Sequence, residues 1–246
     1  MAQADFRFYA ELNDFLPPSK KLVSFTHIFE ARASIKDMIE SQGVPHTEVD
    51  RIVVNGELVD LSYIVQDGDR ISVYPVSEST DIRQSSRVRP KLFVPRFVLD
   101  VHLGKLATSL RMLGFDTLYR NDYADEELAH ISSTEDRILL TRDRGVLMRS
   151  VVTYGYYVRE TNPQQQVVEV LRRFDLFGSV APFQRCLRCN GLLSPVSKET
   201  IIELLPPQIQ QSIDEFHRCL ECDRIYWKGS HYERMQKFIK GVLNSQ

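Results

Sequence analysis

The first 76 residues alternate apolar and polar positions in short runs, as half-buried strands do. The predicted elements are, in order, strands over 5–12 and 22–30, a helix over 34–44, a strand–turn–strand over 51–61 and a strand over 67–75. Ser34 suits the N-cap of the helix and Gly43 its end. Asn55-Gly56 is the turn expected between two paired strands. This segment therefore predicts a small α+β domain.

From residue 92 onward the pattern changes to strands that alternate with helices. Strands are predicted over 92–100, 115–120, 137–141 and 151–158, and helices over 102–114, 125–135 and 163–175. The first of these helices repeats leucine at Leu103, Leu106 and Leu110, and Gly114 is its expected end. Such alternation predicts an α/β domain with a mostly parallel sheet that helices cover on both faces.

Composition adds a domain boundary to this picture. The chain has 246 residues, 43% apolar and 26% charged, which is enough for ordinary folded cores. Its net charge is −2, but residues 1–76 hold 7 basic and 12 acidic side chains, whereas the remainder holds 24 and 21. The polar segment 77–91 between these parts is typical of a linker. Without a long apolar run or a signal-peptide pattern, a cytoplasmic protein with no membrane span is expected.

Four cysteines form two C-x-x-C pairs, Cys186 with Cys189 and Cys219 with Cys222. Two such pairs can complete a tetrahedral thiolate shell, and soft sulfur ligands favour Zn²⁺. A four-thiolate site has no open position, so a structural zinc in a zinc ribbon is predicted. The alternative is a redox-active pair, which two pairs in series disfavour.

Acidic residues follow three successive strands of the α/β segment. They are Asp100 after the first, Asp122, Asp125 and Glu126 after the second, and Asp143 after the third. Ligands of parallel sheets bind at the carboxyl ends of strands, so these carboxylates are candidates for a Mg²⁺ or Mn²⁺ site that hydrolyses phosphodiesters. Alternatively, Asp125 is the cap of a helix and Asp143 a turn residue. Each acid alone favours such a structural role, and only the set favours a metal.

Two resemblances extend these predictions. The ending NGELVDLSYIVQDGDRISVYP resembles ubiquitin-like β-grasp domains of the sulfur-carrier type. Those carriers end in a free Gly-Gly, but this chain continues through Pro75 without one. The resemblance therefore implies a domain that binds a protein partner or regulates.

The segments FVLDVHLGKLATSLRMLGFDT, NDYADEEL and RILLTRDRGVL, continuing to WKGSHYERM, resemble the Mut-seven C-terminal RNase family. This resemblance implies a PIN-like nuclease fold and an RNA substrate. It makes Asp100, Asp125 and Asp143 the metal acids, with Asp122 and Glu126 as additional members. The cations expected to bind RNA phosphates are Lys105, Arg142, Arg144, Arg149 and Arg188. Alternatively, these side chains only balance the negative charge of nearby acids and do not bind RNA.

The predicted organisation has four parts: a ubiquitin-like domain over 1–76, a linker over 77–91, a PIN-like domain over 92–182, and a zinc ribbon with a C-terminal helix over 183–246. The predicted function is RNA binding with metal-dependent RNA cleavage. A non-catalytic RNA-binding module is one alternative. The other is a scaffold protein that recruits a partner through its ubiquitin-like domain.

Overall fold

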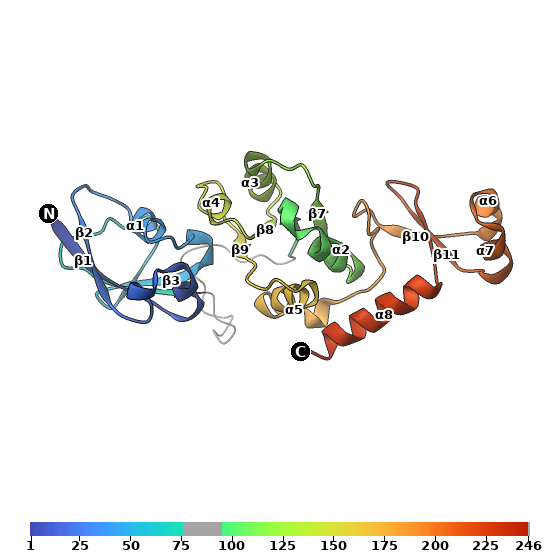
Figure 1. The fold of residues 1–246 in the computed structure, drawn as a ribbon. Coiled ribbons are helices and arrows are strands. Elements are labelled where there is room, and N and C mark those ends of the chain that lie inside the picture. Colours follow the sequence, from blue (N-terminus) through green and yellow to red (C-terminus); the bar gives the residue numbers. More distant parts are fainter. Residues whose placement is uncertain (76–94, 246) are drawn as a thin grey trace. The chain divides into compact units, whose positions relative to one another are not determined.

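The computed structural model describes residues 1–75 and 95–245, so the predicted linker over 77–91 lies outside the described residues (Figure 1). The chain divides into two compact units, each discontinuous in sequence. The N-terminal unit contains the described part of Met1–Val94 together with Tyr123–Tyr157. The C-terminal unit contains Pro95–Asp122 together with the described residues from Val158 onward.

A mixed five-stranded sheet forms the first part of the N-terminal unit, with strand order β2-β1-β5-β3-β4. Its strands are β1 (Ala2–Phe8), β2 (Phe25–Phe29), β3 (Val49–Val54), β4 (Glu57–Val59) and β5 (Arg70–Pro75). β1 and β5 are parallel, and the other neighbours are antiparallel. Helix α1 (Ile35–Ser41) buries Ile35, Met38 and Ile39 in the core of this domain. This arrangement confirms the β-grasp prediction.

Local signals placed the ends of these elements correctly. The Ser34 hydroxyl accepts the Asp37 N–H at 3.1 Å and caps α1, and Gly43 follows the helix with φ +88°. Asn55 and Gly56 have φ values of +53° and +92°, as a type I′ turn requires.

The first strand is shorter than predicted because the chain turns at Ala10, whose φ is +44°. β1 ends at Phe8, and a 3₁₀ helix, η1 (Ala10–Phe15), replaces the end of the strand predicted over 5–12. The Asn13 side-chain amide donates to the Phe8 carbonyl at 3.0 Å and to the Ala10 carbonyl at 2.9 Å. These bonds hold the turn in place.

The second part of the N-terminal unit contains two helices and two strands. They are α3 (Asp125–Thr134), β8 (Ile138–Thr141), α4 (Arg144–Leu147) and β9 (Gly155–Tyr157). β8 and β9 pair in parallel. The predicted strand over 151–158 is confirmed but reduced to its central three residues.

The C-terminal unit begins with β6 (Phe97–Leu99), which pairs in parallel with β7 (Thr117–Tyr119). A 3₁₀ helix, η4 (Val101–Leu103), precedes α2 (Gly104–Met112), which packs against α5 (Pro163–Arg173). The pairs β6–β7 and β8–β9 are both parallel, which confirms the predicted α/β class for this part of the chain.

The cysteine segment forms an antiparallel sheet in the order β10-β11-β12. Its strands are β10 (Leu193–Val196), β11 (Phe216–Cys219) and β12 (Ile225–Trp227). The long gap between the cysteine pairs holds α6 (Lys198–Ile201), η6 (Ile202–Leu204) and α7 (Pro207–Ser212). Ile201, Leu205 and Phe216 form a small separate core where this insertion covers the sheet. The arrangement is that of a zinc ribbon with a helical insertion.

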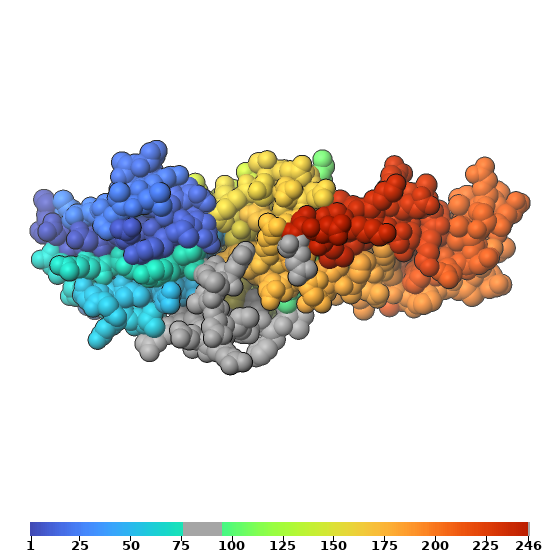
Figure 2. All heavy atoms as spheres, turned by 90° about the horizontal axis from the view of Figure 1, so that it is seen from below, coloured from blue at the N-terminus to red at the C-terminus, as the bar shows by residue number. Residues whose placement is uncertain are grey.

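Helix α8 (Ser230–Leu243) follows the ribbon and packs against α5 (Figure 2). Its buried residues are Ile239 and Val242. Within residues 1–75 and 95–245, no helix is long and apolar enough to cross a membrane.

Gly114 gives a test of the C-terminal unit. It follows α2 with φ +98°, and a Cβ built there would lie 2.2 Å from the Ala181 carbonyl oxygen. We expect Gly114→Ala to lower the free energy of unfolding by about 3 kcal/mol, because backbone strain and steric overlap add. Gly56→Ala is the matched control. It has a similar φ of +92° with nothing within 4 Å, so only the strain of about 1 kcal/mol remains.

Urea denaturation followed by circular dichroism measures both variants. The fluorescence of Trp227, the only tryptophan, reports the unit that contains Gly114. Equal losses in the two variants would show that the close approach to Ala181 is unimportant.

Candidate metal centre and acidic strand ends

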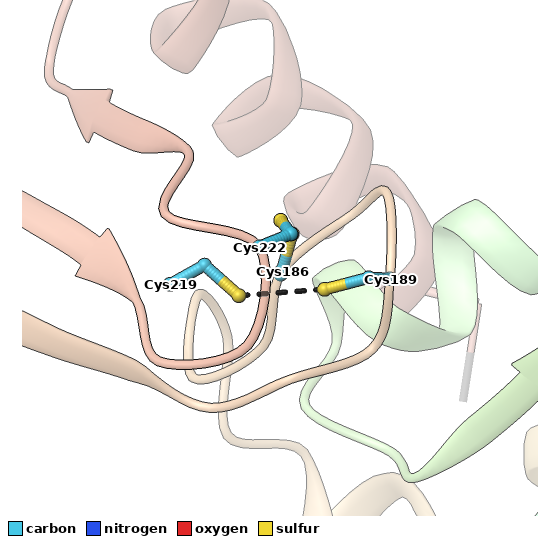
Figure 3. A group of neighbouring side chains, drawn as sticks. All are labelled: Cys186, Cys189, Cys219 and Cys222. Atoms are coloured by element: carbon cyan, nitrogen blue, oxygen red, sulfur yellow. Dashed lines mark hydrogen bonds between the residues drawn. The ribbon is translucent and has the colours of Figure 1, made fainter.

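The four cysteines lie on two loops of the ribbon and point toward one another (Figure 3). Their sulfur atoms all lie within 4.8 Å of each other. The Cys186 and Cys222 sulfurs are 3.6 Å apart, and those of Cys189 and Cys219 are 3.4 Å apart. A tetrahedral site with Zn–S bonds of about 2.3 Å places its sulfurs about 3.8 Å apart. The cluster therefore fits a tetrahedral metal ion such as zinc.

The first loop has its shape because of Asn190 and Gly191. Asn190 adopts φ +74°, and the Cys186 N–H donates to the Gly191 carbonyl at 2.8 Å. A Cβ on Gly191 would lie 3.0 Å from the Cys219 sulfur and 2.5 Å from the Glu221 Cγ. The Asn-Gly pair that sequence analysis would assign to a turn therefore also leaves room for the second cysteine loop.

Burial and hydrogen bonding shift the pKa values of two of the thiols in opposite directions. Burial raises the pKa of the Cys189 thiol to about 12. Burial opposes ionisation of Cys186 too, but hydrogen bonds from the Tyr226 hydroxyl and from two backbone N–H groups outweigh it and bring the pKa of Cys186 to about 6. Four thiolates so close together repel one another, so full ionisation of the cluster needs a bound cation.

The first cysteine loop is anchored to the α/β part of its unit by Arg111 of α2, which is 3% exposed. The guanidinium donates to the Leu187 carbonyl at 3.2 Å and to the Arg188 carbonyl at 2.8 Å. It also donates to the Thr117 carbonyl at 2.8 Å and to the Tyr119 carbonyl at 3.4 Å. One buried cation thus ties the metal loop to strand β7.

Asn190 makes a second connection between the same elements. Its side-chain oxygen accepts the Thr117 N–H at 2.9 Å, and its side-chain amide donates to Asp116 at 2.8 Å. Sequence analysis identified neither this role nor that of Arg111. One signal for Arg111 was available in the sequence: it is a charged residue within the apolar helix that contains Ala107 and Leu110. A charge buried in this way needs hydrogen-bond partners.

Two of the predicted acids lie in the C-terminal unit. Asp100 follows β6 directly and is 5% exposed, and its backbone carbonyl accepts the Leu103 N–H at 2.9 Å. Asp122 is exposed, and its carboxylate accepts the Arg120 Nε–H at 2.9 Å. That hydrogen bond lowers the pKa of Asp122.

Three predicted acids lie in the N-terminal unit. Asp125 is the first residue of α3, whose N-cap is Ala124, so the capping role considered for Asp125 is wrong. Glu126 follows it and pairs with Arg149 at 2.7 Å. Its own backbone N–H and the Arg149 guanidinium both hydrogen-bond to this carboxylate and lower the pKa of Glu126.

Asp143 has the structural role considered for it. Its carboxylate accepts the Gly145 N–H at 2.7 Å and caps α4. Its own N–H donates to the Thr141 hydroxyl at 2.9 Å. This capping leaves the carboxylate exposed.

The predicted phosphate-binding cations differ in their surroundings. Lys105 and Arg188 are exposed, and Arg142 is half-buried after β8. Arg149 pairs with Glu126. Arg144 donates to the Phe15 carbonyl at 3.1 Å, so its guanidinium is engaged within the protein.

Metal content tests the cysteine cluster. We expect the purified protein to hold one equivalent of a thiophilic metal such as zinc, and Cys219→Ser to lose it, because a thiolate ligand is removed. Leu220→Ser, at an exposed neighbouring position, is the control that should keep the metal. Elemental analysis with a chelator release assay measures both. Affinity should fall as pH is lowered, because protons compete for the thiolates. A Cys219→Ser protein with unchanged metal content would contradict the site.

Arg111→Met tests the anchor. We expect it to lower the free energy of unfolding by about 3 kcal/mol, since several buried carbonyls lose their donor. The metal should also leave faster, because the Leu187 and Arg188 carbonyls no longer hold the loop. Arg172→Met, at an exposed position of α5, should change neither property. Urea denaturation and chelator-driven metal release are the measurements, and an unchanged release rate would show that the anchor does not act on the metal loop.

Comparison with known families identifies both parts of the chain. Residues 95–239 match the family described as the Mut7-C RNAse domain, and residues 1–81 match the one described as Mut7-C ubiquitin. No curated protein and no solved structure matches the chain significantly. The first match spans more than half of the 246 residues. The chain therefore belongs to the Mut7-C RNAse family and carries a Mut7-C ubiquitin domain before its RNAse domain.

Proposed function

We propose that this protein is a metal-dependent ribonuclease that hydrolyses RNA phosphodiester bonds with carboxylate-bound Mg²⁺ or Mn²⁺. Membership of an RNAse family supports a nuclease-type function. The observation that supports the metal site most directly is the position of Asp100. This residue is 5% exposed and follows Phe97, Val98 and Leu99, which are fully buried, at the carboxyl end of β6. Ligands of parallel sheets bind at the carboxyl ends of strands.

The proposed metal acids are Asp100, Asp125 and Asp143, with Asp122 and Glu126 as additional members. Asp100 follows β6, Asp122 follows β7 and Asp143 follows β8, whereas Asp125 and Glu126 begin helix α3. Carboxylate oxygens are the ligands that Mg²⁺ and Mn²⁺ prefer. A bound divalent ion would polarise the phosphodiester and lower the pKa of an attacking water.

The proposal assigns the RNA phosphates to Lys105, Arg142, Arg149 and Arg188. Lysine and arginine neutralise phosphates and set the register of the strand without reading its sequence. Arg144 is engaged with Phe15 and is given a different role below. The cysteine cluster is proposed to hold a structural zinc, because four thiolates leave no position for water or substrate.

Charge-removing substitutions test the acids. We expect Asp143→Asn to reduce cleavage by at least about a hundredfold, because the amide cannot supply the anionic ligand that the metal needs. Asparagine still accepts the Gly145 N–H and still caps α4, so the fold is preserved. Asp100→Asn should have the same effect. Asp136→Asn is the matched control, since Asp136 is exposed before the same strand, β8, that Asp143 follows. Its φ of +50° suits asparagine.

The assay uses zinc-loaded full-length protein, with labelled single-stranded and structured RNA, in Mn²⁺, in Mg²⁺ and with neither ion. Cleavage that needs the added ion and disappears in Asp143→Asn would support the proposal. Wild-type cleavage by Asp100→Asn would refute the site. Intact RNA with salt-dependent binding would instead favour a non-catalytic RNA-binding module. If the protein neither binds nor cleaves RNA, the result would favour a scaffold protein whose ubiquitin-like domain recruits a protein partner.

A further inference from the structure

Within the N-terminal unit, the β-grasp domain packs against the segment that contains α4 and β9 (Figures 1 and 2). Tyr157, the last residue of β9, packs on the hydrophobic core of the β-grasp domain. Its ring meets that of Phe15 edge-on, with centroids 5.5 Å apart. The two parts therefore share a core and are not joined only through the chain between them.

Arg144, although an exposed residue, binds both Phe15 and Tyr157 in this contact. Its guanidinium donates to the Phe15 carbonyl at 3.1 Å and lies 5.1 Å above the Phe15 ring. The Tyr157 ring is 5.9 Å from the same guanidinium. A cation that lies within 6 Å of two aromatic rings and also donates to a carbonyl makes a specific contact, because shape, charge and hydrogen bonding all act on one group.

A 3₁₀ helix of the β-grasp domain, η3 (His46–Glu48), makes the second set of contacts. The Glu48 carboxylate, 1% exposed, accepts the Tyr157 N–H at 2.6 Å. The His46 ring lies 2.9 Å from the Val152 carbonyl oxygen. A Cβ on Gly155 would lie 3.3 Å from the Thr47 side chain, so the two backbones approach closely. A hydrogen bond from a backbone N–H to a buried carboxylate is stronger than one to a neutral acceptor, so it favours the docked arrangement.

The segment held in this way carries Asp143. Arg144 follows Asp143 directly and is the first residue of α4, which has only four residues. So short a helix is not stable by itself and depends on tertiary contacts. The Asp143 carboxylate is oriented by the Gly145 N–H of that same turn. The position of the Asp143 carboxylate therefore depends on what holds α4.

We propose that the ubiquitin-like domain acts in cis as a positioning element for Asp143, with Arg144 as the positioning residue that joins the two. This inference rests on the proposed ribonuclease function for its effect on cleavage, but the docking itself does not. The face formed by Phe15, His46 and Glu48 is covered within the chain. A protein partner of the ubiquitin-like domain must therefore use another face.

Hydrogen exchange in the free full-length protein tests the docking. Arg144→Met keeps the length of the side chain and removes its charge and donors, and Phe15→Leu keeps an apolar side chain and removes the ring. We expect each to speed exchange of the amides in 143–148 by about tenfold, because one hydrogen bond or one cation–π contact is lost. Exchange in β3 should stay unchanged. Arg70→Ala, at an exposed position of β5, is the control that should alter neither.

Unchanged exchange over 143–148 in Arg144→Met would overturn the proposal. Equal acceleration in β3 and in 143–148 would also overturn it, because the effect would then be general destabilisation of the unit.

Metal dependence of cleavage tests the positioning. We expect Arg144→Met to raise the Mn²⁺ concentration for half-maximal cleavage severalfold and to leave the KM for RNA unchanged, with Arg144→Lys restoring part of the loss. A raised KM at unchanged metal dependence would make Arg144 a phosphate-binding residue and overturn the positioning role. If the wild-type protein cleaves no RNA, the proposed function fails, while the exchange measurement still decides whether the domain is docked through Arg144.

Discussion

A guanidinium that stays charged at any ordinary pH has to find acceptors wherever it is buried, and in the C-terminal unit that constraint organises the fold. The Arg111 guanidinium satisfies this constraint by donating to backbone carbonyls of strand β7 and of the first cysteine loop. These hydrogen bonds hold the first cysteine loop against β7. The stability of the cysteine cluster and the stability of the α/β core of this unit are therefore coupled. A bound metal would stabilise both, because Arg111 and Asn190 each join the cysteine loop to the α/β core.

In the N-terminal unit an arginine that is exposed, and not buried, also joins two distant segments. Arg144 also donates to a backbone carbonyl of a distant segment, and aromatic rings complete its surroundings. In both units a side chain that resembles a surface cation in the sequence joins two pieces of chain. The proposed RNA contacts are correspondingly fewer than the number of basic residues suggests. Arginine content alone is thus a poor measure of a nucleic-acid surface in this protein.

Sequence reasoning was most successful where the signal is local. Ser34, Gly43 and the Asn55-Gly56 turn were placed correctly because capping and left-handed backbone depend on a few adjacent residues. The cysteine pairs were recognised because metal geometry fixes their spacing. The acids after the strands were found as positions, but their roles as metal ligands stay predictions. The expected domain boundaries within 92–246 also stay predictions.

What sequence reasoning missed depends on long-range contacts. Arg144 lies 129 residues from Phe15, and no periodicity links the two. The stop at Ala10 is the exception, because it depends on the nearby hydrogen bonds from Asn13 to the Phe8 and Ala10 carbonyls. The helical insertion between the cysteine pairs was hidden because its apolar positions serve a small separate core. In each case the partner, not the residue type, decides the outcome.

The discontinuity of the two units has a consequence for synthesis on the ribosome. The N-terminal unit has all its residues once Tyr157 has been added, whereas Pro95–Asp122 must wait for the chain beyond it. Leu187 and Arg188 follow Arg111 by 76 and 77 residues. At about 5–20 residues per second, Arg111 and the apolar residues around it remain without their final partners for about 4–15 seconds. The nascent chain thus has its complete N-terminal unit before helix α2 can pack against α5 and before Arg111 can bind the first cysteine loop. That interval is when chaperones would be most useful to this protein.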